Sequence, residues 1–179
     1  GGARSLREGA GAFAAALGLG FRSFFLEQEP IKAPAAKDRD AAVAFAAAKL
    51  GIDNFFCFDG KCPVRTPDGV EDLVLKVAVA NTGTHQFEII EPVSGPTWIY
   101  TDGVDLDRQA LTLHHVGVAV VGPYALWQDT IARLRADGDE IVQISELAPG
   151  EEPQAMFAYV DNRATLGHHT EYLWWAPSL

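Results

Sequence analysis

Basic residues, cysteines and long apolar runs are all scarce in this sequence. Lysine and arginine number 14 against 24 aspartate and glutamate residues, which gives a formal net charge of −10. This balance repels the phosphates of nucleic acid, and no local basic patch offsets it, so we expect no nucleic-acid partner. No segment reaches the roughly 18 uninterrupted apolar residues that a membrane-spanning helix needs, so we expect no membrane partner either.

The sequence has only two cysteines, Cys57 and Cys62, with the turn-forming pair Asp59-Gly60 between them. This spacing could close a hairpin disulfide or supply half of a metal site. Folds that depend on disulfides use more cysteines than this, so the sequence favours two free thiols. Free thiols are typical of a reducing compartment, and we therefore expect a cytoplasmic protein.

The apolar content is high enough for a substantial core. The chain of 179 residues is 48% hydrophobic and has ten phenylalanines and four tryptophans, which suits one domain or two fused halves. Residues 1–20 combine Arg4 and Arg7 with an Ala/Gly/Leu run and resemble a weak secretory signal. We favour instead an N-terminal arm or short helix, residues 1–27, that covers the edge of the domain.

The first half of the remaining chain, residues 28–93, is predicted to contain one strand, one helix and three further strands. Asp38 begins an alanine-rich helix that ends before Gly51. β-Branched and aromatic residues indicate the strands. The expected strands cover residues 31–36, 52–58, 73–80 and 86–90. The proline- and glycine-containing stretch between the second and third of them is predicted to be a loop.

The second half, residues 111–179, repeats this order of elements. An amphipathic helix is expected at 127–136, before Gly138. The expected strands cover residues 112–121, 140–144, 156–160 and 170–175. Residues 94–110 form a proline- and glycine-punctuated linker that holds one short helical turn. The repeat predicts an α+β fold of two βαβββ modules whose curved mixed sheets surround a central pocket.

Histidine is concentrated at the strands that begin or end a module. The five histidines are His85, His114, His115, His168 and His169. Successive side chains of a strand point to opposite faces, so alternation decides which residues share the pocket. The apolar row at Val116, Val118 and Val120 suits the helix side of its strand. This leaves His115 on the pocket face and places His114 on the opposite face.

Two carboxylates are predicted on the same pocket face. In the last strand of the first half, the apolar residues take the helix side, so Gln86 and Glu88 face the pocket. In the last strand of the chain, the aromatic residues pack outward, which turns His169 and Glu171 inward. We expect Gln86 and His169 to line a substrate pocket.

Glu88, His115 and Glu171 therefore converge in one concave sheet. A carboxylate buried on a sheet face is costly unless it is paired, hydrogen-bonded or bound to a cation. Two carboxylates and one imidazole suit a divalent ion such as Zn, Ni, Co, Mn, Mg or Fe. The alternative is that each residue is an ordinary satisfied polar group, with Glu171 paired to Arg163.

Several stretches resemble the glyoxalase/bleomycin-resistance/dioxygenase superfamily, also called the vicinal oxygen chelate superfamily. They are HQFEIIEPVSGP (85–96), LHHVGVAV (113–120), IARLRADG (131–138) and FAYVDNRATLGHHTEYLW (157–174). The resemblance covers residues 36–175. It implies two βαβββ units around a cavity, with metal ligands on the first and last strand of each unit. Three of these four positions match, at Glu88, His115 and Glu171.

The fourth position departs from the family pattern. His115 and Glu171, the two ligands of the second module, are 56 positions apart, and 56 positions before Glu88 is Lys32. Counting back from the first helix instead gives Ile31. Neither residue is a usual ligand, and Glu29 or Gln28 would serve only if the strand were slipped. The metal would then have three protein ligands plus water or substrate, or would be absent.

The resemblance implies a metal-dependent lyase or isomerase-like enzyme that acts on a small oxygenated organic molecule. The metal would stabilise an enediolate, and Glu88 or Glu171 would act as the base. The rival hypotheses are a non-catalytic, bleomycin-resistance-like binding protein and a ring-cleaving dioxygenase. The superfamily pairs modules within or between chains, which makes a homodimer one arrangement that the resemblance allows.

Overall fold

In a computed structural model of the chain, the described residues are 31–83, 85–103 and 111–177. The first half contains β1 (Ile31–Ala35), α2 (Arg39–Leu50), β2 (Phe56–Thr66), β3 (Gly69–Asn81) and β4 (Gln86–Ser94). The second half contains β5 (Thr112–Val120), α4 (Tyr124–Asp137), β6 (Ile141–Ser145), β7 (Ala155–Val160) and β8 (His169–Trp175). Two short helices, α3 (Trp98–Thr101) and α5 (Arg163–Leu166), follow β4 and precede β8.

Part of the chain lies outside this description. The predicted N-terminal arm, residues 1–27, is not among the described residues, and neither are Gln28 and Glu29. Among the described helices, none is both long and apolar enough to cross a membrane.

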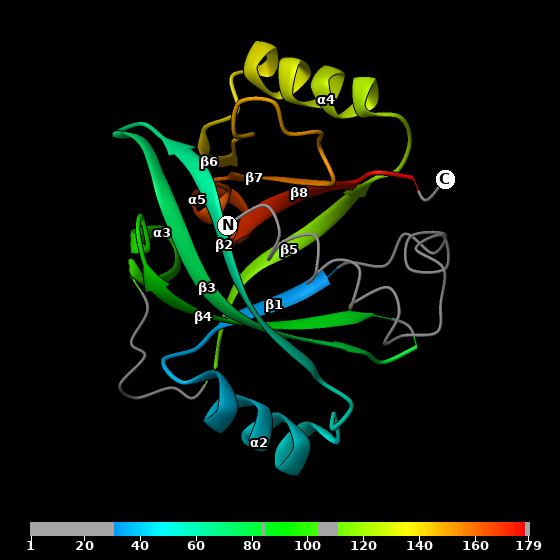
Figure 1. Cartoon of the computed structure of the whole chain (residues 1–179). Helices are drawn as coiled ribbons and strands as arrows, with labels where there is room; N and C mark the ends of the chain where they lie inside the picture. Colours follow the sequence, from blue (N-terminus) through cyan, green and yellow to red (C-terminus); the bar gives the residue numbers. More distant parts are fainter. Residues whose placement is uncertain (1–30, 84, 104–110, 178–179) are drawn as a thin grey trace.

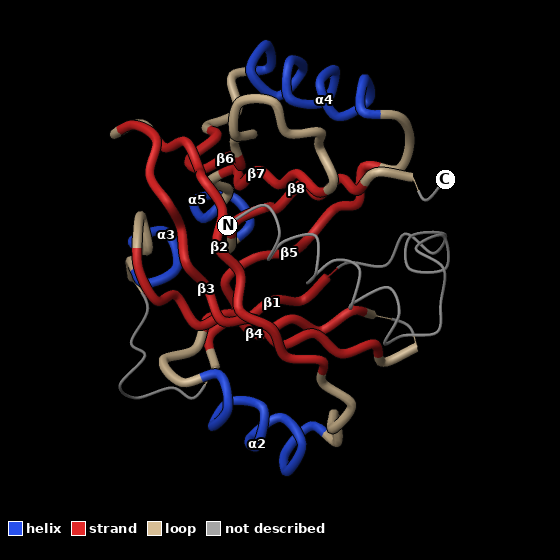
Figure 2. Tube along the Cα trace, viewed as in Figure 1, coloured by secondary structure: helices blue, strands red, loops and turns tan. Residues whose placement is uncertain are grey.

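The eight strands described close into one barrel in the order β1-β4-β3-β2-β6-β7-β8-β5 (Figure 1 and Figure 2). In each half the first strand runs parallel to the last, with β1 beside β4 and β5 beside β8. The two halves join through the antiparallel pairs β1–β5 and β2–β6. The predicted α+β fold of two βαβββ units is therefore confirmed.

Helix α2 packs on the outside of the barrel (Figure 1). Asp38 caps its first turn by accepting hydrogen bonds from two backbone amides, and Gly51 ends it in the left-handed conformation. Ala42 and Ala46 are buried against Ile89 of β4. Because these contacts occupy one face of β4, the alternate residues of that strand are left to face the interior of the barrel.

Helix α4 covers the other side of the barrel in the same way (Figure 2). Its residues Trp127, Ile131 and Leu134 recur at helical spacing and are buried against Val120 of β5 and Trp174 of β8. The outward packing of Trp174 confirms the predicted alternation in β8. Each βαβββ unit thus uses its helix to fix the face of the two strands that carry polar residues inward.

The loop predicted between residues 58 and 73 is wrong, because β2 and β3 form one long hairpin. The strands pair from Phe56 opposite Val79 to Thr66 opposite Gly69. Pro63 lies within β2, where its ring has no amide hydrogen to donate, and its carbonyl accepts a hydrogen bond from the Glu146 amide at 2.9 Å. The turn lies instead at Pro67 and Asp68, and Gly69, which begins β3 directly after it, has a φ of 134° that favours glycine.

The predicted linker takes part in the core. Its helical turn is α3, where Ile99 and Tyr100 are buried against Ile90 of β4 and Tyr159 of β7. The segment after β4 therefore packs against both halves of the barrel.

Both cysteines are free, as predicted. Cys57 and Cys62 lie five positions apart in one strand, so they point to opposite faces and are separated by about 16 Å along it. A disulfide between them, and a metal site that uses both, are therefore incompatible with this strand.

The two thiols should differ in reactivity. Cys57 is exposed, whereas burial, with the nearby Asp72 carboxylate, raises the pKa of Cys62 to about 12. Because the thiolate is the nucleophile, a disulfide-exchange reagent near neutral pH should label Cys57 quickly and Cys62 only after denaturation. A Cys57→Ser variant should lose the fast phase. Failure to label either residue in denaturant before reduction would contradict the assignment of free thiols.

The packing between α2 and β4 should be a measurable part of the stability. Ile89 is fully buried beneath α2, whereas Val93, in the same strand, is 49% exposed. Ile89→Ala should lower the free energy of unfolding by about 2–5 kcal/mol in a urea titration. Val93→Ala should change it by less than about 0.5 kcal/mol. Equal effects of the two substitutions would mean that α2 does not pack on this face.

Candidate metal centre

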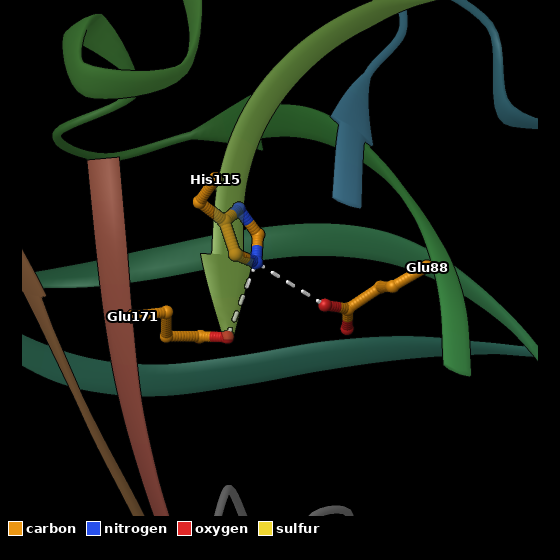
Figure 3. Close-up of side chains that lie close together, drawn as sticks. All are labelled: Glu88, His115 and Glu171. Atoms are coloured by element: carbon orange, nitrogen blue, oxygen red, sulfur yellow. Dashed lines mark ion pairs between the residues drawn. The ribbon is translucent and has the colours of Figure 1, made fainter. Parts of the chain in front are cut away.

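Three polar side chains meet inside the barrel, one from each of three strands. His115 comes from β5, Glu88 from β4 and Glu171 from β8 (Figure 3). The His115 Nε2 atom lies 3.1 Å from Glu171 Oε2 and 3.5 Å from Glu88 Oε2. One ligand atom of each residue lies within 4.8 Å of the others. The strand alternation predicted this convergence, and the structure contains it.

The cluster is shielded from solvent and incompletely hydrogen-bonded. His115 is 0% exposed and Glu171 is 4% exposed, while Glu88 is partly buried. Within the described residues, His115 Nε2 and Glu171 Oε2 have no hydrogen-bond partner. Buried polar atoms in this state are costly, and a cation between them would satisfy both. One imidazole nitrogen with two carboxylate oxygens is a donor set that suits Zn, Mn, Co, Ni, Fe(II) or Mg.

The charges of the cluster act on one another. Burial lowers the pKa of His115, but Glu171 and Glu88 oppose this and raise it to about 9. Burial raises the pKa of Glu88, while the imidazole of His115 beside it lowers it. The two carboxylates therefore favour a positive charge at His115 Nε2, which is either a proton or a metal ion that replaces it.

His114 was predicted to point to the opposite face of β5 from His115, and its contact with His115 was not foreseen. Its Nδ1 atom is 2.9 Å from Nδ1 of His115, and its Nε2 atom is 2.7 Å from the carbonyl oxygen of Ile99. Nδ1 is bonded to Cγ, the ring atom that carries Cβ, so it lies near the backbone, and consecutive histidines can meet there although their side chains diverge. Burial lowers the pKa of His114 well below its ordinary value, and His115 and His169 lower it further.

The two predicted pocket residues lie in different places. Gln86 lines the main cavity. His169 is 2% exposed and is not among the residues that line this cavity, because its ring packs against His114 with a centroid distance of 4.7 Å. Strand β8 places His169 level with His115.

The alternative in which Arg163 neutralises Glu171 is wrong. Arg163 bonds instead to Asp161 at 2.7 Å and to Asp102 at 3.1 Å. Glu171 therefore has no cationic partner among the described residues other than His115.

The fourth ligand position that the resemblance implied corresponds, by strand register, to Ile31. In the second module, Glu171 pairs with the residue two positions after His115. In the first module Lys32 pairs with the residue before Glu88, so the residue after Lys32 is level with Glu88. Two positions before that residue is Ile31. Ile31 is the residue obtained by counting back from the helix, whereas the 56-residue interval gave Lys32. Isoleucine has no ligand atom, so the described cluster offers three protein ligands.

The cavity beside the cluster has a volume of about 480 Å³. Glu88 and Glu171 lie in its wall, and most of the remaining lining is aliphatic or aromatic. A cavity of this size and character can enclose a small organic molecule.

Three polar residues of the site's surroundings escaped the sequence-based prediction. Tyr159 lies opposite Glu171 in the β7–β8 pair, and its ring packs against that of His115 at a centroid distance of 5.0 Å. Tyr100 donates a hydrogen bond of 3.1 Å to the side-chain oxygen of Gln143. The available signal was Gln143 itself, a polar residue in the apolar strand β6.

No protein-family model matches the sequence, and a comparison with curated proteins gives no match. Solved structures do resemble the fold. A variant of methylmalonyl-CoA epimerase from Streptomyces coelicolor, in complex with 2-nitronate-propionyl-CoA, has a TM-score of 0.51 and 18% identity and covers 84% of this chain and 96% of its own. A second variant of that epimerase has a TM-score of 0.50 and 16% identity, with coverages of 83% and 94%.

The epimerase from Mycobacterium tuberculosis is similar at a TM-score of 0.49 and 16% identity, over 86% of this chain and 91% of its own. Methylmalonyl-CoA epimerases are members of the glyoxalase/bleomycin-resistance superfamily. The match at a TM-score of 0.51 confirms the glyoxalase-like fold that the sequence motifs implied.

The cluster should bind a divalent ion. Equilibrium dialysis against Zn²⁺ or Mn²⁺ should give about one ion per wild-type chain. His115→Ala and Glu171→Gln should both lose it, because each removes a buried ligand. A hundredfold excess of metal over its dissociation constant should stabilise the wild type by about 2.7 kcal/mol, and the His115→Ala variant should show no such gain.

The matched controls are His168→Ala and Glu140→Gln. His168 bonds to a backbone carbonyl outside the cluster, and Glu140 is exposed beyond the end of α4. Both variants should retain the ion. Loss of metal from these controls to the same extent as from the cluster variants would rule out this site.

Proposed function

We propose that this protein is a metal-dependent isomerase- or lyase-like enzyme that moves a proton next to a carbonyl group of a small organic molecule. The observation that carries the proposal is the cluster of Glu88, His115 and Glu171, buried beside an apolar cavity with unsatisfied atoms facing one another. The similarity in fold to methylmalonyl-CoA epimerases is compatible with this class of reaction.

Glu88, His115 and Glu171 would hold the metal. A divalent ion there would polarise neighbouring substrate oxygens and stabilise the negative charge of an enediolate that develops when a proton leaves. The protein's own contribution is to keep water away and to hold the donors in fixed positions. His115 is fully buried and Glu171 is nearly so, and the ring of Tyr159 packs against that of His115.

Glu88 is the better candidate for the base. Its carboxylate is more accessible than that of Glu171, with 19% against 5% of the side chain exposed, and it lies farther from His115. It also lines the cavity, where a substrate would be bound. Glu171 is more deeply buried and lies closer to His115, so it is better suited to remain a ligand.

The lining favours an apolar substrate without phosphate groups. Lys61 is the one basic side chain among the described lining residues, and it is ion-paired to Asp72 at 2.6 Å. Glu151 and Glu152 add negative charge to the same wall. Because these carboxylates would repel the phosphates of a coenzyme A thioester, we propose an uncharged molecule with adjacent oxygens as the substrate.

A non-catalytic binding protein is the second candidate. The isoleucine at the fourth ligand position and the aromatic lining from Phe58, Phe157 and Trp175 favour it. A ring-cleaving dioxygenase is less favoured, because the cluster contains a single imidazole rather than two.

Exchange of substrate hydrogen with solvent deuterium tests the proposal. Uncharged α-hydroxy ketones and 2-oxo aldehyde thiol adducts should be incubated in deuterated water with metal-saturated protein and followed by proton NMR. The wild type should catalyse exchange at the carbon beside the carbonyl, and Glu88→Gln should slow it by about 10²- to 10⁴-fold. Glu152→Gln, which alters an exposed carboxylate of the cavity wall, should retain the wild-type rate.

The binding-protein hypothesis makes the opposite prediction. Its ligand would stabilise the protein equally with and without metal, and no compound would exchange hydrogen. That pair of results would overturn the enzymatic proposal.

A further inference from the structure

His114 connects His115 of the candidate metal centre to helix α3. The ring is 4% exposed and lies between His115 and helix α3. One of its nitrogens meets His115 Nδ1 at 2.9 Å, and the other meets the Ile99 carbonyl oxygen at 2.7 Å. The ring also packs against Tyr100 at a centroid distance of 4.8 Å. Both nitrogens of this buried imidazole are therefore engaged.

The direction of these two hydrogen bonds follows from their acceptors. A backbone carbonyl can only accept, so His114 Nε2 carries a hydrogen and donates it to Ile99. A neutral imidazole has a hydrogen on one nitrogen only, which leaves a lone pair on His114 Nδ1. The hydrogen between the two Nδ1 atoms must then belong to His115, which donates it to His114.

This arrangement selects the state of His115 that can bind a metal. With its hydrogen on Nδ1, the neutral His115 ring has its lone pair on Nε2, the atom that faces Glu88 and Glu171. The opposite tautomer would place a hydrogen at Nε2, where no ion could then be bound. A ligand histidine is commonly oriented by a carboxylate or a carbonyl on its other nitrogen, and here a second imidazole is in that place.

We propose that His114 is a positioning residue that, through its bond to Ile99, fixes the tautomer and ring orientation of His115 for metal binding at Nε2. This inference rests on the proposed metal centre. It gives α3 a role in the site, because the Ile99 carbonyl determines which nitrogen of His114 is free to accept. The two imidazole rings are nearly perpendicular, at 86°, and their Nδ1 atoms lie 2.9 Å apart.

Two substitutions at His114 separate the hydrogen bond from packing. His114→Phe keeps an aromatic ring against Tyr100 and removes both hydrogen bonds. His114→Asn is smaller, but its side-chain oxygen can stand near the position of Nδ1 and accept from His115. In a competition titration with a chelator, His114→Phe should bind Zn²⁺ about 10- to 100-fold more weakly than the wild type. His114→Asn should recover part of this loss.

Nitrogen-15 NMR of the zinc-loaded protein gives a readout that packing alone would not change. The wild type should show His115 with hydrogen on Nδ1 and zinc on Nε2, and His114 with hydrogen on Nε2. In His114→Phe, the His115 Nδ1 hydrogen should exchange faster with solvent. His168→Phe, at a residue outside the cluster, should leave both the His115 signals and the zinc affinity unchanged.

The outcomes separate this inference from the proposed function. If the wild type and His114→Phe bind zinc equally tightly with the same His115 signals, the positioning role is wrong and the metal centre stands. If the wild type binds no zinc, both are wrong. If His114→Phe does not fold, the wild-type spectrum and the zinc affinity of His114→Asn still test the positioning role. A wild-type spectrum with the hydrogen of His114 on Nδ1 would contradict the inference.

Discussion

The cost of burying two carboxylates beside one imidazole is the constraint on which the rest of this structure depends. Glu171 and His115 are almost wholly removed from solvent, and Glu88 is largely so. Charged groups in such a place require partners, since the loss of hydration is worth several kcal/mol per ion. The described residues supply only the three groups themselves, which makes a bound cation the simplest means of balancing their charges.

The closed barrel maintains this arrangement because the register of its strands leaves the groups no room to separate. Strands β4, β5 and β8 carry the three residues, and the parallel pair β5–β8 fixes the level of His115 relative to Glu171. The helices on the outside hold the opposite faces of the same strands. Around the cluster, Tyr159 and His114 both contact His115, so that two residues of the second half of the chain support this ligand.

The sequence predicted the parts of the site that depend on strand alternation. Glu88, His115 and Glu171 follow from a period of two once the apolar residues are given to the helices, and the element order gave the βαβββ repeat. The long β2–β3 hairpin was missed, because Pro63 was taken to interrupt a strand that tolerates it. The contact of His114 with His115, and the placement of His169 outside the cavity, depend on α3, whose packing is not encoded in any local pattern.

The central claim is that one metal ion binds between Glu88, His115 and Glu171. Anomalous scattering from a crystal grown with Mn²⁺ or Zn²⁺ tests it most directly. We predict one strong peak inside the barrel, about 2.0–2.2 Å from His115 Nε2 and from one oxygen of each carboxylate. A crystal that contains the ion elsewhere on the protein, with no peak between these three residues, would contradict the account.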